Sequence, residues 1–202
     1  MSKVYSFEGL VPVIKPGAFV HPDAVLIGDV VIGTGCFIGP CAVLRGDFGR
    51  IEIHDGANVQ DNCVVHSFPG RSVIVEEDGH IGHAAVLHAC TIKKNALVGM
   101  NATVMDNAVV GVSAFVAANS FVKAGFEVPD FTLVAGVPAK IIKKMGENEV
   151  KWKSSATAAY QDLAKRSLAT MRAVEALTEE EPDRARAAET EHVKPLSELK
   201  QS

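Results

Sequence analysis

Residues 92–122 read IKKNALVGMNATVMDNAVVGVSAFVAANSFV and repeat with a period of six residues. An aliphatic residue occupies every sixth position, and a small residue follows four places after each of the first five. Because both positions recur without exception, we expect both to point into the protein interior. The aliphatic positions are Ile92, Val98, Val104, Val110, Val116 and Val122, and the small ones are Ala96, Ala102, Ala108, Ala114 and Ser120.

The same repeat organises the earlier part of the chain. An amphipathic helix needs a period of 3.6 and an ordinary strand a period of 2, so neither explains a period of six. Three short strands per triangular turn explain this period, if successive coils stack at the strand spacing of about 4.8 Å found in any sheet. The seventeen repeats predict a parallel β-helix of between five and six coils over about residues 11–125. The earlier aliphatic positions are Val20, Leu26, Ile32, Ile38, Leu44, Ile53, Val59, Val65, Val75, Ile81 and Leu87, and glycine often follows, as expected at tight turns.

The pattern changes to that of a helix from about residue 147 to residue 176. One stripe carries Ala156, Tyr160, Leu163, Leu168, Met171 and Val174, and we expect this stripe to pack on the β-helix. Residues 178–202 hold seven acidic and four basic side chains with almost nothing to bury, which predicts a flexible charged tail. The expected organisation is a β-helix domain over 1–140, a helical segment over 141–177 and the tail over 178–202.

Composition argues against several classes of partner. The 202 residues carry a net charge of −4 and no dense Lys/Arg stripe, so a nucleic acid is not an expected partner. No apolar run reaches the roughly 18 residues of a membrane span, and Glu8 lies where a signal peptide needs apolar sequence. We therefore expect a cytoplasmic protein with no membrane contact. Cys36 and Cys63 occupy inward positions, which argues against thiol catalysis.

Polar residues can be placed on the faces of the β-helix from the phase of the repeat alone. Every third repeat shares a face, and the residues that follow the aliphatics of one face are Arg45, His66 and His88. His66 and His88 should therefore point outward one strand spacing apart, which suits two imidazoles that share a metal ion.

A third histidine belongs to another face. His83 follows Ile81 by two residues, on the face that carries Gln60, so its outward direction diverges from those of His66 and His88. It could join them only where a neighbouring chain packs alongside, and a cyclic trimer is the natural closed assembly. Three neutral imidazoles plus a water match a catalytic zinc site.

Further polar residues lie near these histidines. Arg45 and Asp47 fall in an interruption of the repeat, and we interpret them as a salt bridge that holds the trimer, the alternative being a solvated turn. Asn58, Gln60 and Asp61 could orient a ligand or water through hydrogen bonds, or simply cap exposed coil edges.

Other polar residues have a simpler structural interpretation. Three lysines near the end of the solenoid could meet phosphates of an acyl carrier but more readily form a solvated cluster. Tyr160 could reach a neighbour's site but fits simple packing. The remaining histidines fit structural or solvated positions. The lysines are Lys140, Lys143 and Lys144, and the remaining histidines are His21, His54, His80 and His192.

The set Arg45-Gly46-Asp47, Asn58-Val59-Gln60-Asp61-Asn62, His66, Gly82-His83 and Leu87-His88 resembles the γ-class carbonic anhydrase family of hexapeptide-repeat proteins. The resemblance implies a trimer of left-handed β-helices in which His66 and His88 of one subunit and His83 of the next bind zinc. It also implies that Arg45 and Asp47 form the interface pair and that Gln60 contacts the water on the metal. The segment 133–140 resembles the closing turn of this superfamily.

The chain to about residue 176 further resembles a narrower branch, that of the phenylacetate-degradation protein PaaY and the carnitine operon protein CaiE. This branch implies a thioesterase that acts on thioesters derived from phenylacetyl-CoA. Carbonic anhydrases of the family carry a proton-transferring glutamate after Arg-Gly-Asp, whereas Phe48 follows Asp47 here. We therefore predict a zinc-dependent acyl-CoA hydrolase, with iron or cobalt as other possible metals. CO2 hydration and a metal-free acyltransferase that uses one histidine as base are the alternatives.

Overall fold

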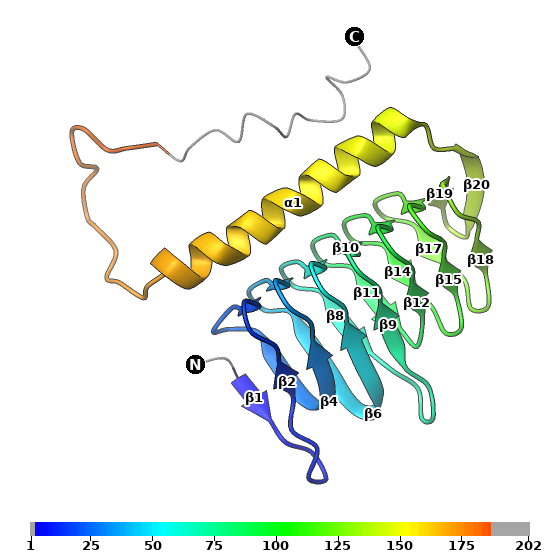
Figure 1. Cartoon of the computed structure of the whole chain (residues 1–202), viewed down its shortest axis with the longest axis horizontal. Helices are drawn as coiled ribbons and strands as arrows, with labels where there is room; N and C mark the ends of the chain where they lie inside the picture. The colour runs from blue at the N-terminus through cyan, green and yellow to red at the C-terminus, as the bar shows by residue number, and fades with distance from the viewer. Residues whose placement is uncertain (1–2, 187–202) are drawn as a thin grey trace.

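Each six-residue repeat forms one short strand and one corner of a left-handed triangular solenoid, followed by a single helix (Figure 1). The structure is a computed structural model that describes residues 3–186. The solenoid has about seven turns, in place of the five to six coils that the repeat count predicts. The fold class predicted from the period is confirmed.

The strands form three faces, two of which belong to one sheet. Two long strands, β4 (Val25–Ile32) and β6 (Val43–Ile53), bend around a corner and join the first face to the second. The first face adds β1 (Lys3–Tyr5), β8 (Val64–His66), β11 (Val86–His88), β14 (Thr103–Val104) and β17 (Phe121–Val122). The second adds β2 (Val13–Ile14), β9 (Val73–Val75), β12 (Thr91–Ile92), β15 (Val109–Val110) and β18 (Glu127–Val128). The third holds β3 (Phe19–Val20), β5 (Phe37–Ile38), β7 (Asn58–Val59), β10 (His80–Ile81), β13 (Leu97–Val98), β16 (Phe115–Val116), β19 (Thr132–Gly136) and β20 (Ala139–Lys144).

The core is a stack of aliphatic and small side chains in alternating positions. The aliphatic side chains of Ile92, Val98 and Val104 are fully buried. Ala96 and Ala102, which follow Ile92 and Val98 by four residues, are fully buried as well. All solenoid coils pair in parallel register, for example Ile92 opposite Val110. The inward direction predicted for both positions of the repeat is therefore confirmed.

The glycines that follow the aliphatics have a different role from the predicted one. Gly82 and Gly99 do not have positive φ; a Cβ on Gly99 would lie 2.5 Å from the backbone nitrogen of Ala118 in the next coil. The left-handed conformation is taken up by a later corner residue, such as Asn101 with φ 57°. Glycine is needed after the aliphatic because adjacent coils approach closely there, and asparagine tolerates the turn itself.

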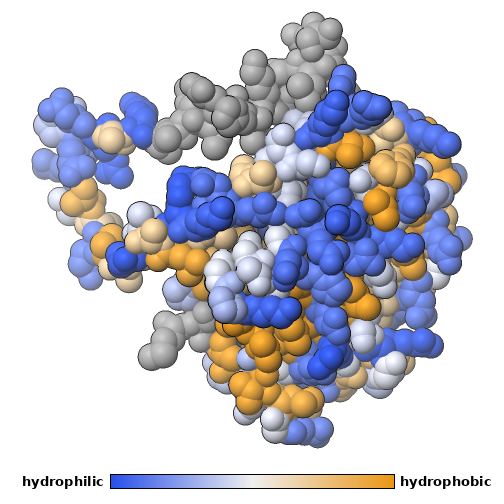
Figure 2. All heavy atoms as spheres, viewed as in Figure 1, coloured by the Kyte–Doolittle hydropathy of each residue, from blue (hydrophilic) through white to orange (hydrophobic). Residues whose placement is uncertain are grey.

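The solenoid extends beyond the predicted limits at both ends. Strand β1 adds the start of a coil before residue 11, and β18 and β19 continue the stack beyond residue 125. The segment 133–140 does close the solenoid, because β20 folds back antiparallel on β19. Figure 2 shows apolar surface at the end where β1 and β2 lie, because no further coil covers it. The exposed side chains there include Tyr5, Leu10, Val11, Val13 and Ile14.

Helix α1 (Glu147–Thr170) runs back along the solenoid from the β20 end toward β3 (Figure 1). The predicted stripe is only partly correct: Tyr160 and Leu163 pack against Phe19 and Phe37, but Leu168 is exposed. The fully docked face instead carries Lys153, Thr157, Ala164 and Ser167. The helix also ends before the predicted residue 176, at Thr170. Among the described residues no helix is both long and apolar enough to span a membrane.

Residues 171–186 form no helix or strand, and the rest of the predicted tail, 187–202, lies outside the described residues.

Candidate metal centre

The structure stacks three predicted site residues on the first face. Arg45 lies opposite His66, and His66 lies opposite His88, on the successive strands β6, β8 and β11. The predicted register of His66 and His88 is therefore confirmed. Their ring centroids are 5.3 Å apart with an interplanar angle of 51°. Two imidazoles bound to one tetrahedral zinc at about 2.0–2.1 Å have ring centres about 5 Å apart, so the pair already has a suitable separation.

His66 and His88 each have a carboxylate on one ring nitrogen. Nε2 of His66 lies 3.1 Å from Oδ1 of Asp47, and Nδ1 of His88 lies 2.7 Å from Oδ1 of Asp106. A carboxylate accepts a hydrogen bond, so in the neutral ring the opposite nitrogen keeps its lone pair. Carboxylate partners of this kind commonly orient histidine ligands of metals.

Asp106 was missed by the sequence analysis, although a signal exists. Leu87 pairs with Val104 on the next coil of the same face, and Asp106 lies two residues after Val104, one place beyond the position opposite His88. Applying the period to acidic residues as well as to histidines would have found it.

His83 has the same arrangement on the corner after β10. Its Nδ1 lies 3.0 Å from Oδ2 of Asp61, and its Nε2 lies 3.4 Å from the hydroxyl of Tyr160 on α1. Tyr160 thus reaches the predicted ligand of its own chain. Within residues 3–186, no group of three or more His, Cys, Asp or Glu side chains in a single chain could hold a metal ion. The structure therefore does not unite His83 with the His66–His88 pair, and a complete three-histidine site needs a second chain.

Arg45 and Asp47 form an ion pair inside one chain. Nη1 of Arg45 lies 2.7 Å from Oδ2 of Asp47, whose other oxygen faces His66. Burial opposes ionisation of Asp47, but the hydrogen bonds from Arg45 and His66 outweigh it and hold its pKa below the ordinary carboxyl value. Asp47 is therefore ionised beside His66, and the predicted role of this pair in a trimer interface stays a prediction.

Two of the three predicted polar residues on and just after β7 lie beneath α1 rather than at an exposed coil edge. Asn58 is fully buried and Gln60 is 2% exposed, and Nε2 of Gln60 lies 3.0 Å from Oδ1 of Asn58. Asp61, by contrast, is partly exposed and pairs with His83. His80, which is 8% exposed, joins Asn58 and Gln60, a contact that the period of the repeat does not predict.

Two aromatic side chains border the histidine pair. The ring of Phe48 lies 5.3 Å from that of His66, and the ring of Phe68 lies 6.5 Å from that of His88. Both phenylalanines are more than half exposed. The pair of histidines thus lies between two exposed apolar rings contributed by the interruptions of the repeat.

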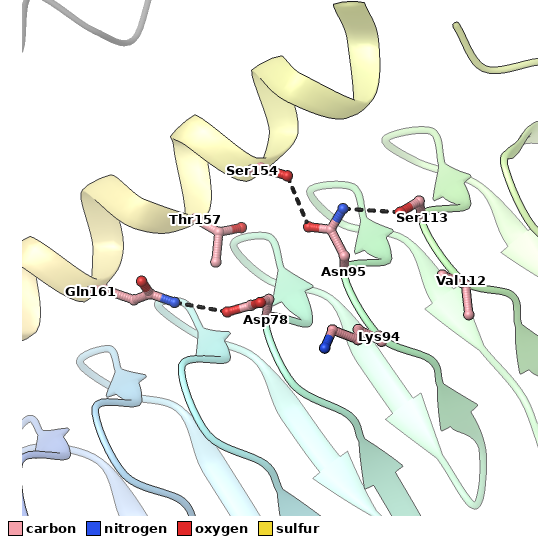
Figure 3. A pocket seen from close by; sticks show the side chains of 8 residues that line it. All are labelled: Asp78, Lys94, Asn95, Val112, Ser113, Ser154, Thr157 and Gln161. Carbon is pink, nitrogen blue, oxygen red and sulfur yellow. Dashed lines mark hydrogen bonds between the residues drawn. The ribbon is translucent and has the colours of Figure 1, made fainter. Parts of the chain in front are cut away.

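A polar hollow of about 380 Å³ separates α1 from the corners of the solenoid (Figure 3). Its walls are tied together by hydrogen bonds, from Gln161 to Asp78 at 2.9 Å and from Ser154 to Asn95 at 3.3 Å. Beside it, the fully buried Lys153 donates to the carbonyl of Asp78 and to Oδ1 of Asn95. These contacts hold the helix on the solenoid.

Cys36 and Cys63 are poorly suited to thiol catalysis, and one lysine of the basic cluster has a carboxylate partner. Burial raises the pKa of the Cys36 thiol to about 12 and that of Cys63 to about 11, so neither supplies a thiolate near neutral pH. Lys143 pairs with Glu149 at the start of α1.

Comparisons with known proteins agree with this architecture. A family model described as "Bacterial transferase hexapeptide (six repeats)" matches residues 12–46. The carnitine operon protein CaiE of Salmonella typhimurium is 49% identical over 193 residues, which cover 96% of this chain and 98% of that protein.

Solved structures agree as well. A hexapeptide transferase family protein from Anaplasma phagocytophilum has a TM-score of 0.77 and 38% identity, covering 80% of this chain and 96% of that one. A putative acetyltransferase from Bacillus cereus has a TM-score of 0.81 and 34% identity, and the match covers 82% of this chain and 96% of that one. Given the near full-length match at this identity, the repeat and the shared solenoid, the chain belongs to the CaiE family of hexapeptide-repeat proteins.

Proposed function

We propose that the chain is a zinc-dependent hydrolase of acyl-CoA thioesters that works as a homotrimer. In this proposal His66 and His88 of one chain and His83 of the next hold the metal. The observation that carries it is the pairing of each of these histidines with a carboxylate: Asp47, Asp106 and Asp61. Three independent His–Asp pairs at the three predicted ligands are the arrangement that prepares imidazoles for a metal.

The donor set fits zinc. Three neutral imidazoles leave a fourth coordination position open, as catalytic zinc sites require, and iron or cobalt accept the same donors. Zinc in this position would polarise the thioester carbonyl and activate a water for attack. The chain itself orients the rings through the three carboxylates and supplies the polar side chains of Asn58, Gln60 and Asp61 nearby. Hydrolysis adds the elements of water across the C–S bond and releases a carboxylic acid and the CoA thiol.

The aromatic side chains beside the histidines support an apolar acyl group. Phe48 and Phe68 flank His66 and His88 and offer apolar surface to a substrate that reaches the metal. Thioesters derived from phenylacetyl-CoA suit such surroundings. The relatives are named after the carnitine operon, so carnitine-derived acyl-CoA esters are the second group to be tested. Substrates of this kind are found in the cytoplasm, where we place the reaction.

The decisive experiment follows thiol release from both groups of acyl-CoA ester by the zinc-loaded protein. The proposal predicts release by the native chain and its loss in His88→Ala, with zinc content falling in parallel. His54→Ala is the matched control, because His54 is a partly exposed histidine of the second face whose ring nitrogens lie against Glu52 and Glu77. Absence of release from every ester, or full activity in His88→Ala, would contradict the proposal.

Two other functions have an observation in their favour. The His–Asp pairs would equally serve CO2 hydration, which a direct assay of the zinc-loaded protein detects. A similar structure is named a putative acetyltransferase, which favours acyl transfer to an acceptor. Transfer needs an acceptor and no metal, so thioester cleavage that survives chelation and depends on an added amine or alcohol would identify it.

A further inference from the structure

The first coil leaves one end of the solenoid open. Strand β1 pairs only with the first part of β4, and β2 only with its second part. Among the described strands, none pairs with the outer edge of β1 or of β2. An unpaired edge presents backbone N–H and C=O groups that suit pairing with another strand. At the other end of the solenoid, β20 folds back on β19 as an added strand, and the first coil has no such cover among the described residues.

The interior of the solenoid is also uncovered at this end. Val4 and Ile14 occupy inward positions, because they lie opposite Leu26 and Ile32 of the next coil. Leu26 and Ile32 are fully buried, whereas Val4 is 37% and Ile14 39% exposed. Figure 2 shows the apolar surface that results. We call this surface the end patch; its large apolar side chains are Val4, Tyr5, Phe7, Leu10, Val11, Val13 and Ile14.

The end patch has the size of a protein interface. Its seven side chains are between 37% and 63% exposed and together present on the order of 600 Å² of apolar surface. A stable interface buries about 800 Å² on each partner, with an apolar centre and a polar rim. The exposed charged side chains of Lys3, Glu8 and Lys15 adjoin the patch in the sequence and supply such a rim.

The same end of a second chain offers what this surface needs. A partner has to present both an unpaired strand edge and an apolar surface, and the end patch itself has both. A two-fold axis makes such a contact self-complementary and closed. The chain's own end is a poorer cover, because residues 178–202 hold seven acidic and four basic side chains and little that is apolar.

The charges beside β1 agree with this arrangement. A two-fold axis reverses the strand direction, so the start of one β1 lies beside the end of the other. Lys3 begins β1, and Glu8 lies three residues beyond its end. Glu8 and Gly9 form a tight turn with positive φ that two backbone hydrogen bonds between Phe7 and Leu10 close, and this turn fixes Glu8 beside the strand. Lys3 of each chain therefore approaches Glu8 of the other.

We propose that the open end of the solenoid binds the same end of a second copy about a two-fold axis, with the two β1 strands antiparallel and the two end patches in contact. The contact doubles whatever assembly the faces of the solenoid build. It is independent of the proposed function, because His66 and His88 lie on β8 and β11, away from the first coil.

Sedimentation equilibrium of the full chain tests the contact. The native protein should contain an even number of chains. Val11→Glu places a charge in the centre of the patch at a side chain that is already 63% exposed, so we expect it to fold normally and to halve the mass. Val137→Glu makes the same change at a 74% exposed valine before β20 and should keep the native mass.

Either of two results overturns the proposal. One is a native mass that corresponds to an odd number of chains, which would leave residues 178–202 or another protein to cover the patch. The other is an unchanged mass in a Val11→Glu variant whose circular dichroism and melting temperature match those of the native chain.

Reversal of the two charges tests the two-fold arrangement. Lys3→Glu or Glu8→Lys alone brings like charges together at both symmetric positions, and we expect the end-to-end dissociation constant to rise at least about tenfold at low salt. The double variant Lys3→Glu/Glu8→Lys restores opposite charges and should recover most of the affinity. A double variant as weak as the single ones would show that Lys3 and Glu8 do not meet, and would overturn the antiparallel contact.

Discussion

Nδ1 of His88 lies 2.7 Å from Oδ1 of Asp106, and the two residues come from adjacent coils of the first face. The carboxylate thereby determines which nitrogen of His88 keeps its lone pair. Both side chains are only about a quarter exposed, so the contact is largely shielded from water. Orientation of this histidine is thus built into the stacking of the coils.

Asp106→Asn should weaken zinc binding without affecting the fold. An amide can still contact Nδ1, but it does not hold the ring N–H as a carboxylate does, and loss of such partners typically costs about 10- to 100-fold in metal affinity. Competition with a chromogenic chelator measures the affinity. Asp162→Asn, which removes only an exposed carboxylate paired with Arg166, should bind zinc normally. Equal affinities for the two variants would remove Asp106 from the site.

Mixing two inactive variants should regenerate activity if the site spans two chains. His83→Ala supplies an intact His66–His88 pair, and His88→Ala supplies an intact His83. In random trimers about one quarter of the interfaces combine the two intact halves, so about a quarter of the native activity should return after unfolding and refolding together. Each variant refolded alone is the control, and no recovery in the mixture would contradict a site shared between two chains.

Phe48→Glu should favour CO2 hydration over thioester hydrolysis. The ring of Phe48 lies 5.3 Å from that of His66, so a carboxylate at this position could carry protons to and from the site. Proton transfer by a positioned side chain often raises a rate by about 100-fold or more, and we expect the rate of CO2 hydration to rise at least about tenfold. Stopped-flow measurement with a pH indicator at low buffer concentration reports the rate. Phe68→Glu makes the same chemical change beside His88 and is the matched control. A gain in neither variant would show that proton transfer does not limit the reaction.

The stability of the native chain should rise with pH above neutrality because of Lys153. Burial lowers the pKa of Lys153 from 10.5 to about 7, so between these values the unfolded chain binds a proton that the folded chain has released. Stability therefore increases with pH in this window, by at most about 1.4 kcal/mol per pH unit. Chemical denaturation at several pH values measures the free energy of unfolding. The Lys153→Met variant is the comparison, and we expect its stability to depend less on pH in this range. Parallel profiles for the two proteins would show that Lys153 remains charged when buried.

The period of the repeat predicts the parts of the site that belong to the solenoid. It placed His66 beside His88 because strand register follows directly from counting repeats. It could not place His80 under α1, because its partner Thr157 is 77 residues away and the docking of a helix does not follow the period. The end of the helix at Thr170 was missed for a related reason: α1 packs on β3, which is the last strand of the third face, so a longer helix would have no surface to cover.

The course of α1 also affects how the chain unfolds. In a solenoid each coil touches only its neighbours, so its two ends can open independently. Here one rigid helix contacts Asn95 through Lys153 and, about two turns further along, Phe37 through Tyr160. Coils that never meet are thereby coupled, and loosening one of them weakens the docking of all the others. The helix converts a one-dimensional stack into a single cooperative unit, and the coils that hold the histidines lie inside the part that it spans.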